Sequence, residues 1–211
     1  MKTNRLRGAI LALLVLVTGG CSNYAFQPPP CDEATSRIVA RVYVLSIPLL
    51  SSNDEFFRIV ETNPDAFAED GLVVRCMRTV GRGLAQQGAS AMQTYRTGSA
   101  VERFGGMMPE GLSHLPGQVD SSLQSYGTDV YAMGEELVWL SQVLPAVSRG
   151  DRAPYNAGQT TSRQLARQAI PVYQMICQMD RSMCQVMFNA IQQVVPTVEE
   201  TIYRMARQLG G

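Results

Sequence analysis

Histidine and lysine are almost missing from this chain of 211 residues, in which His114 is the only histidine and Lys2 the only lysine. A single histidine excludes HExxH zinc sites and most metal centres that use two histidines. The sequence also lacks the GxSxG, CxxC and P-loop patterns of common hydrolases, redox proteins and nucleotide-binding proteins. We therefore expect a protein that is not an enzyme and that has no cofactor.

One enzymatic alternative needs neither histidine nor a cofactor. Enzymes that cleave peptidoglycan can work through carboxylates alone, and Glu102, Glu110 and Glu135 are the candidates here, although no recognisable motif surrounds them. Glu135 and Glu136 are neighbours in a predicted helix, so their side chains point in different directions and we expect both at the surface. His114 lies in a loop rich in glycine and proline, where we expect it to be structural or solvent-exposed.

The first twenty residues have the three parts of a signal peptide. Lys2, Arg5 and Arg7 make the start cationic, residues 8–17 form an unbroken apolar stretch, and small residues at 18–20 precede Cys21. The apolar stretch is well short of the roughly 20 residues that a membrane-spanning helix needs. We therefore assign residues 1–20 to targeting.

The residues around Cys21 suggest a lipid anchor. The segment Val17-Thr18-Gly19-Gly20-Cys21 resembles the lipobox of bacterial lipoproteins, although Thr18 stands where the family usually has leucine. The resemblance implies that Cys21 carries a diacylglyceryl group, with palmitate among its acyl chains. Ser22, rather than aspartate, follows the cysteine, which in that family implies sorting to the outer membrane, on its periplasmic side. An ordinary signal peptidase would also accept Thr18-Gly19-Gly20, and Cys21 would then be unmodified.

Charge and length describe what remains after residues 1–20 are removed. Fifteen arginines then face eighteen acidic residues, a net charge near −3. A nucleic-acid-binding protein needs a basic face, so we exclude nucleic acid as a partner. A mature chain of about 190 residues suits one domain with a sizeable core.

The mature chain divides into a tether and a helical domain. Residues 21–31 include three consecutive prolines and form a proline-rich tether. From Asp32, a plausible N-cap, apolar residues recur at helical spacing as far as Pro48. The further predicted helices are a short one over 52–60, another short one that starts at Asn63-Pro64, and long ones over 72–95, 130–147 and 161–209, the last opened by a capping box and interrupted by Pro171 and Pro196. Loops are expected over 105–117 and 148–159.

No stretch alternates as a β-strand does, and no Asn-Gly hairpin signal occurs. The sequence therefore predicts an all-α fold, a bundle of four or five principal helices over residues 32–211 that is stapled by disulfides. Small residues, among them Gly81 and Gly88, line part of the helix over 72–95. Such residues let a partner helix approach closely.

Four cysteines remain besides Cys21, namely Cys31, Cys76, Cys177 and Cys184. An even count in an oxidising compartment predicts two disulfides, with four free buried thiols as the alternative. Cys177 and Cys184 lie seven residues apart in what we predict to be one helix, about 10.5 Å, which exceeds the roughly 7 Å limit for bridged Cα atoms. We therefore expect each of them to pair with Cys31 or Cys76.

Four methionines recur every fourth residue beside two of these cysteines. Met175, Met179, Met183 and Met187 share one helical stripe with several valines and isoleucines, which favours adaptable packing in the core. Thioethers and thiolates are also soft ligands for Cu(I), so a copper site on this stripe is a weak alternative.

Together these patterns predict a membrane-anchored periplasmic lipoprotein. We expect a non-enzymatic structural or assembly component of a cell-envelope complex, with the membrane and other envelope proteins as its partners. The small-residue face of 72–95 and the methionine stripe are the surfaces that could receive partner helices. The alternative is a periplasmic binding module for a soft metal or an apolar ligand held between helices.

Overall fold

All regular secondary structure in the described residues is helical. The computed structural model describes residues 31–48, 53–97 and 115–210. Its elements are α2 (Glu33–Ser46), α3 (Asn53–Thr62), α4 (Leu72–Thr97), α6 (Leu115–Val147), α7 (Ala153–Asn156), α8 (Thr161–Met179) and α9 (Arg181–Gly210). Five of these helices have 14 or more residues, which confirms the predicted all-α bundle of four or five principal helices. No helix in this part of the chain is long and apolar enough to cross a membrane.

The helix α2 starts where the sequence predicts. Asp32 is its N-cap, and the Asp32 carboxylate accepts a hydrogen bond of 2.7 Å from the backbone N–H of Thr35. This hydrogen bond lowers the pKa of Asp32. The helix ends at Ser46, just before Pro48, because the residue that precedes a proline disfavours helical geometry.

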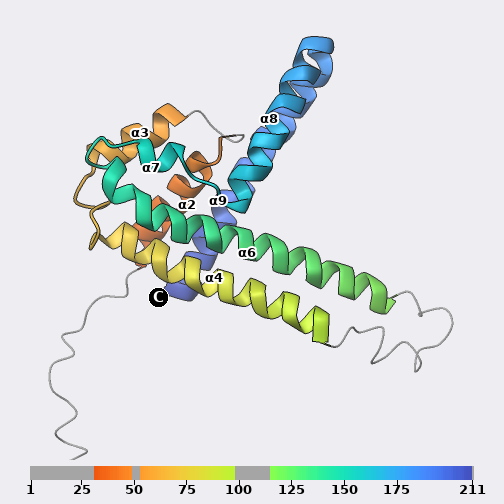
Figure 1. The fold of residues 1–211 in the computed structure, drawn as a ribbon, viewed down its shortest axis with the longest axis horizontal. Helices are drawn as coiled ribbons and strands as arrows, with labels where there is room; N and C mark the ends of the chain where they lie inside the picture. The colour runs from red at the N-terminus through yellow and green to blue at the C-terminus, as the bar shows by residue number, and fades with distance from the viewer. Residues whose placement is uncertain (1–30, 49–52, 98–114, 211) are drawn as a thin grey trace, which may run out of the picture.

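The helices α4 and α6 pack closely side by side (Figure 1). Gly88 is buried, and a Cβ atom on it would lie only 2.5 Å from the backbone N of Tyr131 and 2.6 Å from the carbonyl oxygen of Gly127. Gly81 faces the Val138 backbone in the same way, at 2.8 Å. The small residues of α4 therefore do admit a helix, but that helix is α6 of the same chain, so this face is not free for another protein.

The core lies between α2, α4, α6 and the last turns of α9, and the short helices α3 and α7 close one end of it. Its fully buried large side chains are Tyr155, Phe56, Phe67, Met77, Leu84, Leu137, Leu140, Leu144 and Ile202. Phe56 stacks on Tyr155, with 4.5 Å between the ring centroids. These contacts join segments from the whole length of the domain into one hydrophobic cluster.

Several predicted boundaries were wrong. Pro64 starts a series of turns rather than a helix, and the expected loop over 148–159 contains the short helix α7. The expected loop over 105–117 is helical from Leu115, while its residues before 115 lie outside the described part. The N-cap of α8 is Thr160, one residue before the predicted capping box, and its hydroxyl accepts from the Arg163 N–H.

The two prolines that were expected to interrupt the helix over 161–209 lie inside helices instead. Pro171 is within α8 and Pro196 within α9, so no separate terminal helix begins at Thr197. A proline inside a helix removes one backbone hydrogen bond. Both prolines are exposed, so water can solvate the carbonyl groups that lose their donors.

Candidate functional site

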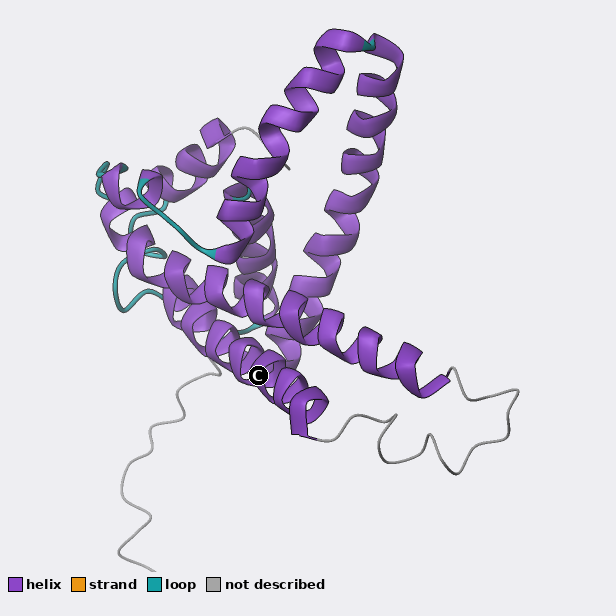
Figure 2. Cartoon of the chain, turned by 45° about the vertical axis from the view of Figure 1, so that its right-hand side comes forward, coloured by secondary structure: helices purple, strands orange, loops and turns teal. Residues whose placement is uncertain are grey.

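A pair of helical arms projects from the body of the molecule (Figures 1 and 2). We call residues 167–201, which comprise most of α8 and the first two thirds of α9, the distal hairpin. Ala166 and Ile202 are buried at its base, at 4% and 0% exposure, yet no residue between them is buried. The distal hairpin therefore has no core of its own.

Asp180 reverses the chain at the tip of the distal hairpin. Its backbone N–H donates to the Ile176 carbonyl and so ends α8, at 2.8 Å. Its carboxylate accepts from the backbone N–H groups of Ser182 and Met183, at 2.8 and 3.1 Å, and so caps the start of α9. The Ser182 hydroxyl, which also donates to this carboxylate, is the main cause of the lowered pKa of Asp180.

This reversal overturns the predicted disulfide pairing. Cys177 is bonded to Cys184 across the tip, with their Cα atoms 4.5 Å apart, and Cys31 is bonded to Cys76. The prediction that Cys177 and Cys184 each pair with an early cysteine was wrong because it assumed one continuous helix. The prediction of two disulfides was correct.

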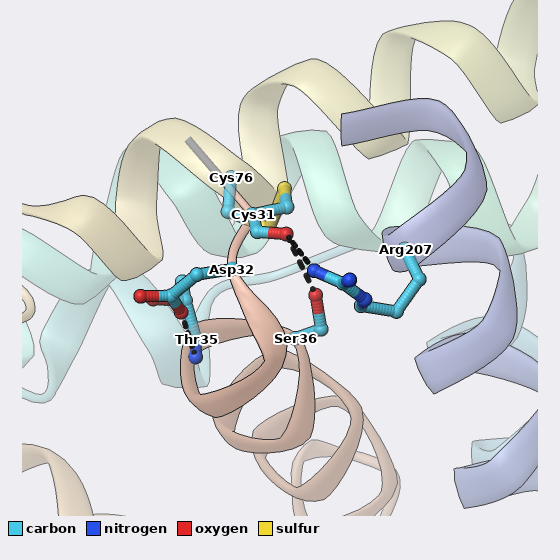
Figure 3. The surroundings of a disulfide bond; sticks show 6 residues. All are labelled: Cys31, Asp32, Thr35, Ser36, Cys76 and Arg207. Carbon is cyan, nitrogen blue, oxygen red and sulfur yellow. Dashed lines mark hydrogen bonds between the residues drawn. A yellow bond between two sulfur atoms is a disulfide. The ribbon is translucent and has the colours of Figure 1, made fainter. Parts of the chain in front are cut away.

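The disulfide between Cys31 and Cys76 fastens the start of the domain to α4 (Figure 3). Both cysteines are fully buried. The carbonyl oxygen of Cys31 accepts from the guanidinium of Arg207 in α9, at 3.1 Å, and from the Ser36 hydroxyl, at 3.4 Å. The first described residue is thus held by α2, α4 and the end of α9 together.

Apolar side chains line the outside of the distal hairpin and its base. The large hydrophobic residues exposed there are Leu165 (60%), Val172 (51%), Met175 (53%), Met179 (79%), Met183 (50%), Val186 (63%), Phe188 (46%) and Val194 (49%). Soluble proteins rarely leave so many large apolar side chains exposed on one pair of helices, and large exposed apolar areas typically mark interaction sites.

The methionine stripe is part of this exposed surface. Met175, Met179 and Met183 are exposed and Met187 is half-buried, so the prediction that the stripe fills the core was wrong. Cys177 and Cys184 are held in a disulfide and offer no thiolate to a metal. The described residues contain no cluster of three histidine, cysteine, aspartate or glutamate side chains. A copper site here would have to use thioethers alone.

Most of each arm of the distal hairpin, residues 168–179 and 182–198, carries no charge. No acidic or basic residue occurs between Arg167 and Asp180, or between Arg181 and Glu199. The polar side chains in these stretches are mainly amides, such as the pair Gln185 and Asn189, which are joined by a hydrogen bond of 3.0 Å. Between residues 168 and 198 charge is confined to the two adjacent tip residues, so these stretches offer a partner only apolar groups and neutral hydrogen-bonding groups.

A buried ion pair holds the base of α8 to the body. The guanidinium of Arg163 donates to the carboxylate of Glu136 in α6, at 3.1 Å, and to the Ser46 carbonyl oxygen, at 3.0 Å. It also lies between two rings, 3.9 Å from the centroid of Trp139 and 4.1 Å from that of Tyr155. We call this arrangement the basal clasp. It joins α2, α6 and α7 to the start of α8.

Glu136 lies at the centre of the basal clasp and is fully buried, so the prediction that it is a surface residue was wrong. Its carboxylate also accepts from the hydroxyls of Thr160 and Ser46. Burial raises the pKa of Glu136, and the opposing effect of Arg163 is smaller. A carboxylate buried in this way persists only when it is paired and hydrogen-bonded.

Glu135, the described candidate for carboxylate catalysis, has a structural role in this fold. Its carboxylate accepts from the backbone N–H of Thr161 at 2.9 Å, and so caps the N-terminus of α8. Glu135 borders an open hollow of about 470 Å³ beside Trp139 and Tyr131, and among the described residues no second carboxylate lines that hollow. Within this part of the chain, the hollow does not have the pair of carboxylates that glycoside hydrolysis uses.

The other predicted site residues lie outside the described part of the chain. These are Cys21 with the whole targeting segment, and Glu102, Glu110 and His114. Comparison of the chain with protein-family models, with curated proteins and with solved structures finds no match. The argument for function therefore depends on the sequence and on this geometry.

Proposed function

We propose that this protein is a lipoprotein of the cell envelope, anchored through Cys21 to the periplasmic face of the outer membrane, where it assembles with other proteins without catalysing a reaction. The distal hairpin is the observation that supports this role, because a surface of large apolar residues without charge is suited to binding protein. The two disulfides agree with an oxidising compartment.

The position of Cys31 also supports an anchored role. Cys31 lies beside Arg207, near the C-terminal end of α9, whereas the tip of the distal hairpin is at the other end of this helix. A helix of 30 residues is about 45 Å long. The ten residues from Cys21 to Cys31 span at most about 35 Å. An anchor at Cys21 therefore favours an orientation in which the tip faces away from the membrane.

The mass of the intact protein from its own envelope tests this proposal. We expect a mass equal to residues 21–211 plus acyl chains, and an increase of four hydrogens after reduction of the two disulfides. The variant Cys21→Ser should lack the acyl chains and should leave the membrane fraction, because no helix in the described residues could replace the lipid as an anchor. A mature wild-type protein without acyl chains would overturn the anchored function.

A further inference from the structure

The helix α8 has two apolar seams, and only one of them is used inside the chain. The inner seam, Ala166, Ala169, Tyr173 and Ile176, has buried or half-buried residues, and the Tyr173 hydroxyl lies 3.8 Å from Cys184 Sγ in α9. The outer seam consists of Leu165, Gln168, Val172, Met175 and Met179, and all of its residues are exposed. Steps of three and four residues separate the members of both seams, which is the spacing by which one helix packs along another. The outer seam therefore has the pattern of a helix contact but no helix against it in the described part of the chain.

The exposed apolar surface of the two arms together is comparable with that of a stable contact, and the outer seam supplies about half of it. Eight large hydrophobic side chains, four in the outer seam and four in α9, are each about half exposed or more and together offer roughly 500 Å² of apolar area at the values typical for such residues. A stable interface buries about 800 Å² of surface on each partner, and about 65% of a homodimer interface is apolar. Each partner of a stable homodimer therefore buries roughly 500 Å² of apolar surface.

The chemistry of the arms makes a lipid bilayer a poor occupant. Asp180 and Arg181 are the tip residues, and these charges would enter the membrane first at a cost of a few kcal/mol each. The amides of Gln174, Gln178 and Gln185 would also lose water without gaining fixed partners. A helix of another protein chain can provide hydrogen-bonding partners for these groups.

A second copy of the same chain fits this surface better than a different protein. Two different proteins commonly select each other through opposite charges, and residues 168–179 and 182–198 of the arms offer none. An amide both donates and accepts hydrogen bonds, so a surface whose polar groups are amides is complementary to itself. Gln168 occupies a position in the outer seam where its amide would meet the same amide of a parallel copy, and a polar residue at such a position fixes register and partner number.

We propose that the outer seam of α8 packs in parallel against the outer seam of a second copy about a two-fold axis, so that two distal hairpins form one bundle. This proposal rests on the proposed function in that it names the partner of the same surface. Parallel packing also puts both Cys31 residues, and hence both tethers, at the same end of the dimer.

Photo-crosslinking of the full chain in its own envelope tests the proposal. A photoreactive p-benzoylphenylalanine replaces Val172 in one tagged copy, and a second copy with a different tag is expressed with it. We expect light to join the two tags in one band of twice the chain mass. The matched control carries the same group at Tyr126, which is equally exposed at 51% but belongs to α6, and should give no such band.

A charge in the outer seam should abolish this product. With Met175→Glu, two carboxylates would face each other across the axis, and we expect the yield of the doubled band to fall about tenfold or more, whereas Met175→Leu should retain it. Unchanged helix content by circular dichroism should show that each exposed substitution leaves the monomer folded.

Three outcomes would overturn the homotypic contact. They are a band that contains only another protein, adducts to lipid alone, or a yield at Val172 no greater than at Tyr126. The Cys21→Ser variant separates this proposal from the anchored function. A doubled band in that variant supports the contact without any lipid, and a wild-type protein without acyl chains overturns the anchor but leaves the contact intact.

Discussion

The molecule contains two antiparallel helix pairs that are packed in different ways. The pair α4 and α6 uses glycines at 81, 88, 127 and 134 to bring the two backbones together, and most residues along this contact are buried or half-buried. The pair α8 and α9 has no glycine between 159 and 209, and the residues from 167 to 201 are at best half-buried. One pair completes its packing within the chain, whereas the other depends on a disulfide, a clasp and, we infer, a second copy.

Breaking the basal clasp should have the largest effect, because it removes the attachment of the second pair to the body. Arg163→Ala leaves Glu136 buried without its cation, and we expect a loss of about 3–5 kcal/mol in the free energy of unfolding. In a domain of this size this corresponds to a fall in Tm of roughly 10 °C, measured by circular dichroism.

The control for the clasp is an exposed ion pair of similar geometry. Arg204 and Glu200 lie 2.7 Å apart in α9, and the side chain of Arg204 is 77% exposed. Arg204→Ala should therefore change the unfolding free energy by less than about 1 kcal/mol. Equal effects of Arg163→Ala and Arg204→Ala would show that the clasp does not hold the base of α8.

The two disulfides should differ in both the size and the extent of their effects. Cys31 and Cys76 close a loop of 45 residues, and replacement of both by alanine should cost about 4 kcal/mol of stability across the body. Cys177 and Cys184 close a loop of only seven residues, so their double replacement should cost about 2 kcal/mol.

Hydrogen exchange distinguishes these two losses by location. In the variant without Cys177 and Cys184 we expect faster amide exchange over 167–201 and unchanged protection in α4 and α6, because no buried residue links the hairpin tip to the core. Faster exchange throughout the domain would show that the distal hairpin and the body unfold as one unit.

Glycine substitutions in α4 test the packing of α4 against α6. They should have a smaller effect than breaking the basal clasp or removing the disulfide between Cys31 and Cys76. Gly88→Ala places a Cβ against the backbone of α6 and should cost about 1–3 kcal/mol, since neither backbone can move away easily. Gly83→Ala meets only the side chain of Leu209, at 3.4 Å, and should be neutral or stabilising by up to about 1 kcal/mol, because alanine favours helix. Thermal unfolding of both variants measures the difference, and equal stability would argue against backbone contact at Gly88.

The sequence predicted the helical class and the start of α2 because both depend on local patterns. Asp32 caps α2 through an N–H three residues away, and the apolar spacing over 72–95 needs no knowledge of its partner. The burial of Glu136 could not be predicted in this way. It depends on Arg163, which lies 27 residues further along the chain and in a different helix.

The distal hairpin was missed because its two arms have the same apolar period, so that the pattern continues across the break. The one local signal is Asp180, an acidic residue between two uncharged stretches that is followed by Arg181 and Ser182. Aspartate is a strong N-cap, and interpreting it as such would have allowed Cys177 and Cys184 to face each other. The exposure of the methionines follows from the same break, since the two arms leave the body together.

The attachment of Cys31 determines how the domain would bear tension. A pull on the chain that precedes Cys31 passes through a covalent bond to Cys76 in α4, and through the hydrogen bond from Arg207 to α9, before it reaches the turns of α2 (Figure 3). The pair of α4 and α6 therefore takes the load through the disulfide. This covalent bond still holds when hydrogen bonds break. Under mechanical stress from a membrane attachment, α2 would be shielded from unwinding as long as the disulfide stays oxidised.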